Sequence, residues 1–120
     1  SKISIITPYL PSGGKQAKDF FEDSGFNVVK IMNFCCKTAL EIAAVGKSQI
    51  KSSIEQVNAQ EVEAIVQVGT NLPFQYYAPI AESELSKPVL SINTATYWYS
   101  IRSLGINDQF DGFGDLFKCY

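Results

Sequence analysis

AIVQVGTNLP, residues 64–73, is the stretch that decides the fold of this chain. Its first five residues form an apolar run, which predicts a strand that stops abruptly at Gly69. The segment that follows, residues 70–73, is short and polar, and it can neither continue a strand nor begin a regular helix. It predicts a loop at the carboxyl end of the strand, which is where open parallel α/β sheets bind ligands. Gly69, Thr70 and Asn71 are therefore the first candidate site residues.

A helix and a second strand follow this loop. Pro79 suits the first turn of a helix, because a backbone N–H is not needed there. Apolar residues continue at helical spacing to Leu85, and Ser86-Lys87-Pro88 breaks the pattern before strand character returns at Val89. The unit is predicted to be a strand, a loop, a helix and another strand.

The rest of the chain repeats this alternation. Because short strands that alternate with helices form parallel sheets, we expect an α/β fold: a three-layer, four-stranded parallel sheet flanked by helices on both faces, in a flavodoxin-like or Rossmann-like arrangement. Segment 33–47 has no clean period and is either a buried loop or a short helix around 38–44. Residues 106–120 are too apolar for a free tail and are expected to pack back over the domain. The predicted strands are Lys2–Thr7, Asn27–Met32, Ala64–Val68 and Val89–Ile92, and the predicted helices are Lys15–Ser24, Ser48–Asn58, one over 79–85 and one from Asn93 or Thr94 to Gly105.

Length and composition limit the functions to consider. The chain has 120 residues, of which 46% are hydrophobic and 18% charged, and this suits one globular domain. A net charge of -2 offers no electrostatic argument for binding nucleic acid or an anionic membrane. No apolar run is long enough to span a bilayer, and the first residues lack the layout of a signal peptide, so a cytoplasmic protein is expected.

The chain contains no histidine and three cysteines, Cys35, Cys36 and Cys119. Without histidine, neither a zinc site nor Ser–His or Cys–His catalysis is expected, and no cofactor or metal is predicted. Cys35 and Cys36 are interpreted as buried structural thiols, because nothing nearby in the sequence except Lys37 would activate a thiol. Cys119 lies among the terminal residues and is interpreted as incidental.

Several short segments, taken in order, form a pattern that no single motif carries. They are Ile5–Tyr9, Ala64–Val66, Gly69–Leu72, Glu82, Lys87–Val89, Ser91–Trp98 and Gly112–Leu116. This ordered set resembles the carboxy-terminal half of the aspartate/glutamate racemase superfamily. Within that superfamily it is most similar to arylmalonate decarboxylases and maleate cis-trans isomerases, and the likeness covers nearly the whole chain.

The resemblance implies one half of a two-domain, racemase-type fold. Members are normally roughly twice this length, with two similar α/β domains that face each other across the active site. Many of them place a proton-transferring cysteine where this chain has Gly69, and a glycine cannot do that work. The resemblance also implies that Tyr9, Thr70 and Asn71 hold a carboxylate or its enediolate, and donors of these kinds suit an oxyanion site on chemical grounds.

The leading hypothesis is a domain of a cofactor-independent isomerase, racemase or decarboxylase that acts on a small carboxylate substrate. The catalytic cysteine would then come from a missing amino-terminal half or from a second subunit, and the isolated domain is expected to be inactive. Exposed apolar side chains near the loop would form a patch that drives association, so a homo-oligomer is expected. The alternative is a catalytically silent α/β domain that binds a small carboxylate or a protein partner. The predicted patch consists of Tyr9, Leu72, Pro73, Phe74, Tyr76 and Tyr77.

Each candidate residue also has a simpler interpretation. Gly69 and Asn71 suit positive φ in a plain connecting loop, and Tyr9 suits an amphipathic position over the sheet edge. Asn93, a second-tier site candidate, is most simply the N-cap of the helix that follows. The Tyr97-Trp98-Tyr99 cluster is more typical of a core stripe on an amphipathic helix than of a stacking surface for a cofactor.

Overall fold

A four-stranded parallel sheet forms the centre of the molecule, as the sequence predicted. The computed structural model describes residues 1–120. The strand order is β2-β1-β3-β4 and every pairing is parallel, so the carboxyl ends of β1 and β3 lie side by side. The predicted bounds agree with the observed bounds to within one residue. The strands are β1 (Lys2–Thr7), β2 (Asn27–Asn33), β3 (Ala64–Gln67) and β4 (Val89–Ser91).

Helices connect the strands and extend beyond the last one. Pro11 lies in the first turn of α1, where its missing N–H costs nothing, and the helix therefore begins earlier than the predicted Lys15. The ambiguous segment forms the short helix α2, and none of the residues of α2 is buried. No helix combines the length and the apolar character that crossing a membrane requires. The helices are α1 (Pro11–Asp23), α2 (Ala39–Ala43), α3 (Lys47–Val57), α4 (Ala78–Leu85), α5 (Ile92–Ser103) and α6 (Asp115–Cys119), with a 3-10 turn η1 (Phe74–Tyr76).

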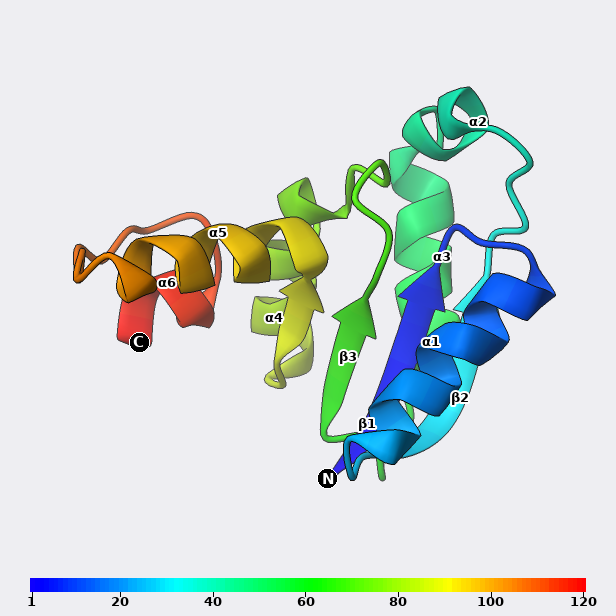
Figure 1. Cartoon of the computed structure of the whole chain (residues 1–120), viewed down its shortest axis with the longest axis horizontal. Helices are drawn as coiled ribbons and strands as arrows, with labels where there is room; N and C mark the ends of the chain where they lie inside the picture. The colour runs from blue at the N-terminus through cyan, green and yellow to red at the C-terminus, as the bar shows by residue number, and fades with distance from the viewer.

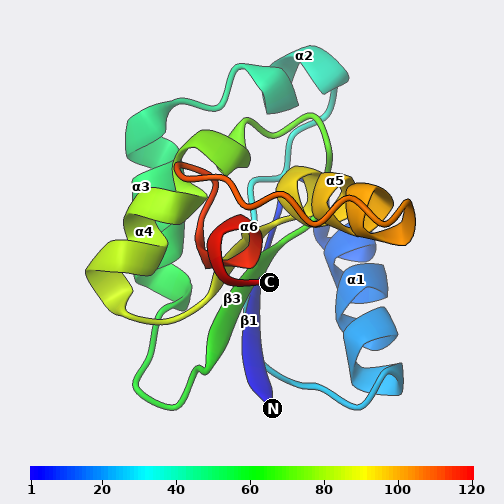
Figure 2. The same cartoon turned by 90° about the vertical axis from the view of Figure 1, so that its left-hand side faces the viewer.

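The sheet has a hydrophobic core on each face. On one face α3 and α4 cover the strands, and Ile6, Ile65 and Val89 are buried beneath them. On the other face α1 covers β1 and β2, above Ile5 and Val28. Figure 2 shows α3 and α4 on one side of the strands and α1 on the other. This is the three-layer arrangement that the alternation of strands and helices predicts.

The face that α1 covers remains open over β3 and β4. The helix α5 begins directly after β4, with no loop residue between them, and runs away from the sheet (Figure 1). Val66 and Leu90 are therefore only half-buried, whereas Ile5 is completely buried. In a doubly wound sheet a helix would normally cover such positions.

The carboxy-terminal residues pack on α5 and α4 rather than over the sheet. The ring of Tyr97 on α5 stacks on Phe117 of α6, with the ring centroids 5.9 Å apart. The Nε of Arg102 donates to the carbonyl of Tyr120 over 2.9 Å. Residues 92–120, called the arm below, therefore form a packed unit that projects beyond β4. The predicted packing of residues 106–120 back onto the domain is observed, against α4 and α5.

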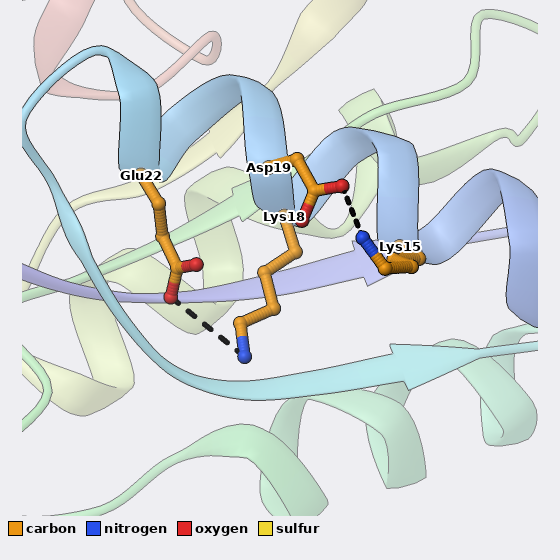
Figure 3. A network of polar contacts seen from close by, with 4 residues as sticks. All are labelled: Lys15, Lys18, Asp19 and Glu22. Atoms are coloured by element: carbon orange, nitrogen blue, oxygen red, sulfur yellow. Dashed lines mark hydrogen bonds and ion pairs between the residues drawn. The ribbon is translucent and has the colours of Figure 1, made fainter.

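Two ion pairs lie along the exposed side of α1 (Figure 3). Lys15 pairs with Asp19, and Lys18 pairs with Glu22, each one helical turn apart. The hydrogen bond to Asp19 is the main reason that the pKa of Lys15 is raised. Because all four side chains are well exposed, the pairs contribute little to stability.

Candidate functional site

The carboxyl ends of β1 and β3 bring Tyr9 and Gly69 together. The two strands are paired in parallel register, so the loops that leave them begin at the same edge of the sheet. A Cβ atom built on Gly69 would lie 3.7 Å from Cζ of Tyr9, which shows that the phenol end of the ring reaches the β3 loop. The Tyr9 backbone N–H donates to Oγ1 of Thr7 over 2.8 Å, and its side chain is 39% exposed. Two of the predicted site residues therefore adjoin each other.

The backbone of the β3 loop presents hydrogen-bond donors that the protein does not use. The N–H groups of Gly69, Thr70 and Asn71 donate to no acceptor in the protein. The side chains of Thr70 and Asn71 are exposed and also make no hydrogen bond. Successive free N–H groups around a glycine with positive φ form the kind of concavity that binds anions. Here φ of Gly69 is 102°.

Asn93 contributes to the site by holding the loop rather than by capping α5. The N-cap residue of α5 is Ser91, so the simple interpretation of Asn93 as the N-cap is wrong. Its Nδ2 instead donates to the carbonyl of Thr70 over 2.9 Å and to Oε1 of Gln75 over 3.4 Å. Both donors of the Asn93 amide are therefore directed at the protein, and Asn93 connects the β3 loop to the start of the arm.

The two adjacent cysteines lie on the loop after β2, next to the Tyr9 loop. The Cys35 N–H donates to the carbonyl of Tyr9 over 3.2 Å, and the Cys36 N–H donates to the carbonyl of Pro8 over 3.0 Å. Cys35 is exposed and Cys36 half-buried, so the interpretation of both as buried thiols is wrong. Burial, followed by the nearby Glu41 carboxylate, raises the pKa of Cys36, which disfavours the reactive thiolate.

Two apolar clusters differ from the sequence-based expectation. Leu72 and Phe74 are completely buried, because the chain folds into η1 and packs them into the core, so the predicted patch is not exposed as a whole. Tyr97 and Tyr99 are 63% and 69% exposed, so the interpretation of this aromatic stripe as core is wrong. The exposed aromatic surface of the chain therefore lies largely on the arm.

The candidate site lies outside the two prominent cavities of the chain. One cavity, about 600 Å³, lies between α4 and the arm and is lined by Glu82 and Lys118 among others. A second cavity, about 440 Å³, lies between α3 and α4 and includes Lys51 and Tyr77. Neither cavity is lined by any of the predicted site residues. Enclosed pockets are the usual form of small-molecule sites, so this edge would need a further wall to surround a ligand.

Sequence reasoning missed Gln67 and Pro8. Gln67 is completely buried, and its Nε2 donates to the carbonyls of Val68 and Gly69 over 2.8 and 2.7 Å. The signal was present, because Gln67 is the one polar residue in an otherwise apolar strand. The Pro8 ring lies against Gly69, and nothing in the sequence indicated that contact.

Fold and site together define an α/β domain with a candidate anion-binding loop at the ends of its strands. Comparison with known proteins finds that this domain is similar to maleate isomerases and to arylmalonate decarboxylase, as the sequence pattern predicted. The chain is 24% identical over 116 residues to a maleate isomerase of Alcaligenes faecalis, covering 96% of this chain and 46% of that protein. It is 24% identical over 118 residues to a maleate isomerase of Nocardia farcinica, covering 98% of this chain and 47% of that protein. The chain therefore spans about half the length of the curated relatives it matches.

Solved structures show the same fold. A maleate cis-trans isomerase of Nocardia farcinica bound to TRIS matches 98% of this chain and 48% of its own, with a TM-score of 0.93 and 24% identity. Arylmalonate decarboxylase matches 97% of this chain and 52% of its own, with a TM-score of 0.81 and 18% identity. No protein-family model matches the sequence. The predicted α/β architecture is confirmed, and so is the predicted resemblance to maleate isomerases and arylmalonate decarboxylases.

Proposed function

We propose that this chain supplies the carboxylate-binding half of an enzyme that isomerises, racemises or decarboxylates a small carboxylate. The three free N–H groups of residues 69–71 carry this proposal, because they are donors at a strand end with no partner in the protein. The Tyr9 phenol and the Thr70 hydroxyl stand beside them as further donors. Such donors stabilise a carboxylate whose negative charge increases during the reaction.

The chemistry of relatives supports this assignment of roles. One solved structure of the Nocardia farcinica isomerase contains a covalently bound succinylcysteine intermediate, and one of a Pseudomonas putida maleate isomerase contains maleate. A succinylcysteine forms when a thiolate adds to one carbon of the maleate double bond and the neighbouring carbon gains a proton. Before protonation, the extra electron pair is delocalised into the adjacent carboxylate as an enediolate. Donors on that carboxylate lower the energy of this state, and the loop of residues 69–71 offers them.

The thiol would be supplied by a second unit, either a missing amino-terminal half or a second subunit. Gly69 offers only backbone at the end of β3, and burial raises the pKa of Cys36. The chain spans only about half of the matched isomerases, and neither prominent cavity of the chain includes the predicted site residues. By itself this chain is therefore expected to bind carboxylates weakly and to turn over none.

Calorimetric titration with maleate tests the binding role. Thr70→Ala and Tyr9→Phe each remove a hydroxyl donor, and each should weaken binding by about 1.5–3 kcal/mol, the usual cost of a lost hydrogen bond to a charged group. Asn71→Ala removes an amide donor and should weaken binding in the same range. Gln60→Ala provides a control, because Gln60 is exposed and precedes β3, at the opposite edge of the sheet. Maleate affinity that is indifferent to all three site variants would place the site elsewhere.

The second candidate function is a catalytically silent carboxylate-binding domain. The absence of any cysteine or histidine at the end of β3 favours it. The two functions predict different results when the first half of a maleate isomerase is added to the chain. Mixing the chain with the first half of a maleate isomerase relative should produce maleate cis-trans turnover under the enzyme proposal. A silent domain would bind maleate with Thr70-dependent affinity in the same mixture but would form no fumarate.

A further inference from the structure

The side chain of Gln67 makes an unusual set of contacts at the base of the site. It leaves β3 on the face covered by α3 and α4 and is completely buried there. Its Nε2 donates to the carbonyl of Val68 over 2.8 Å and to the carbonyl of Gly69 over 2.7 Å. Its Oε1 accepts a hydrogen bond from the Ser91 hydroxyl over 3.3 Å. Both amide hydrogens and the amide oxygen of Gln67 are therefore engaged.

These contacts determine how two peptide units are turned. In an extended strand, successive carbonyls point in opposite directions, whereas here two successive carbonyls converge on one nitrogen. Gly69 permits this arrangement because its φ of 102° lies in a region that side-chain-bearing residues avoid. The Leu72 N–H donates to the same Gly69 carbonyl over 3.3 Å and holds it from a second side.

The turn of the carbonyls sets the direction of the free donors. A peptide unit is planar and trans, so its N–H points opposite to its C=O. The Val68 carbonyl shares a peptide unit with the Gly69 N–H, and the Gly69 carbonyl shares one with the Thr70 N–H. Because Gln67 holds both carbonyls toward the core, both N–H groups point together away from the core. Neither N–H has an acceptor in the protein.

We propose that Gln67 is a positioning residue whose side-chain amide aims the Gly69 and Thr70 N–H groups at the substrate carboxylate. This inference rests on the proposed function and goes beyond it, because Gln67 itself does not touch the ligand. A buried glutamine suits this role, since it has two donors for the two carbonyls and one acceptor that Ser91 orients. The fixed N–H pair is organised before the ligand arrives, which is the condition for strong stabilisation of developing charge.

The hydrogen bonds by which Gln67 holds the Val68 and Gly69 carbonyls are called the clamp below. Two substitutions remove the clamp in different ways. Gln67→Met keeps the approximate size and removes both donors. Gln67→Glu keeps the shape but places carboxylate oxygens against two carbonyl oxygens. Each should weaken maleate binding about tenfold or more, the range for lost hydrogen bonds to a charged group. Ser91→Ala removes only the bond that orients the amide and should weaken binding less. If Gln67→Glu does not fold, Gln67→Met and Ser91→Ala still test the clamp.

A loss of stability alone would not change the direction of the N–H bonds, so this direction provides an independent measurement. Residual dipolar couplings of the Gly69 and Thr70 amides report it in the ligand-free protein, and they should change in Gln67→Met. Ser53→Ala is the matched control, because Ser53 is also completely buried and its hydroxyl donates to the Ile50 carbonyl over 2.6 Å, within α3. This control should lose stability while the two couplings and maleate affinity stay unchanged.

The outcomes separate the inference from the proposed function. Unchanged couplings and unchanged affinity in Gln67→Met would overturn the clamp, whatever the wild type binds. Changed couplings with no maleate binding by any variant, wild type included, would support the clamp geometry and overturn the carboxylate role. Equal losses of affinity in Ser53→Ala and Gln67→Met would show that affinity follows general stability, and the inference would be wrong.

Discussion

The ring of Pro8 lies so close to Gly69 that a Cβ atom added at position 69 would come within 2.5 Å of two ring carbons of the proline. Gly69 also has a φ of 102°, which strains any residue with a side chain. The family resemblance implies a cysteine at this position in many members. In this chain neither the space nor the backbone conformation admits a cysteine, so position 69 can offer a ligand only its backbone groups.

Substitution of Gly69 should therefore destabilise the protein without creating an active thiol. We expect Gly69→Ala and Gly69→Cys to lower the free energy of unfolding by more than the roughly 1–3 kcal/mol typical of backbone strain alone. Gly25→Ala is the matched control, because Gly25 also has positive φ, 91°, but has no atom within 4 Å of an added Cβ. Urea denaturation measures all three variants. Equal losses at positions 25 and 69 would show that the Pro8 contact relaxes easily.

Glu82 should be an anchor of the arm. Its carboxylate is almost completely buried and accepts the Val89 N–H over 3.2 Å and the Asp115 N–H over 2.7 Å, which connects α4 to β4 and α6. Glu82→Ala leaves both N–H groups without this acceptor and should cost about 1.5–3 kcal/mol or more in urea denaturation. Amide exchange at Asp115 should accelerate. Glu84→Ala on the exposed side of the same helix should change neither measurement, and an equal effect of both variants would contradict the anchor.

The three cysteines should differ in reactivity. Burial and the Glu41 carboxylate raise the pKa of Cys36, and only the thiolate reacts, so iodoacetamide near about pH 7 should modify Cys36 more slowly than the exposed Cys35 and Cys119. Mass spectrometry of peptides follows each site. As the pH rises through the raised pKa, the difference should shrink. Glu41→Gln should accelerate modification of Cys36, and modification of Cys36 as the fastest of the three would contradict this prediction.

The exposed aromatic side chains of the arm should promote self-association. Tyr97 and Tyr99 are 63% and 69% exposed on a helix in which Ile101 is the only buried residue, and clustered exposed aromatic side chains favour association. We expect concentration-dependent dimers in light scattering, weakened by Tyr99→Ser. Leu40→Ser, at a residue 83% exposed on α2, is the control. A wild-type chain that stays monomeric at all concentrations would contradict the expected homo-oligomer.

Most of the fold followed from local sequence. The β-branched and apolar runs of the strands are short and bounded by glycine or proline, and these limits placed β1 at Lys2–Thr7 without error. The order of strands and helices then restricts the topology to a parallel sheet with right-handed crossovers. Helix starts do not follow from periodicity in the same way, since α1 begins at Pro11 through backbone geometry that periodicity does not report.

The arm was not predictable because its direction depends on tertiary packing. Its apolar residues predict that the segment is packed, but periodicity does not indicate which elements it packs against. The stack of Tyr97 on Phe117 and the contact of Glu82 with Asp115 hold the arm beside α4, away from the open face of β3 and β4. Each contact joins segments far apart in sequence, so no local pattern encodes it.

The candidate site, like the fold, combines features that follow from residue order with features that depend on tertiary packing. The sequence by itself determined that Gly69, Thr70 and Asn71 follow a buried strand and that no thiol or imidazole stands at its end, because these facts depend only on residue order. Only the tertiary structure decided that Tyr9 meets Gly69 across two strands, that Pro8 closes position 69 to a side chain, and that Gln67 turns two peptide units toward the core. The physical reason is that hydrogen-bond direction and steric exclusion arise between groups that the fold, and not the order of the chain, brings within contact.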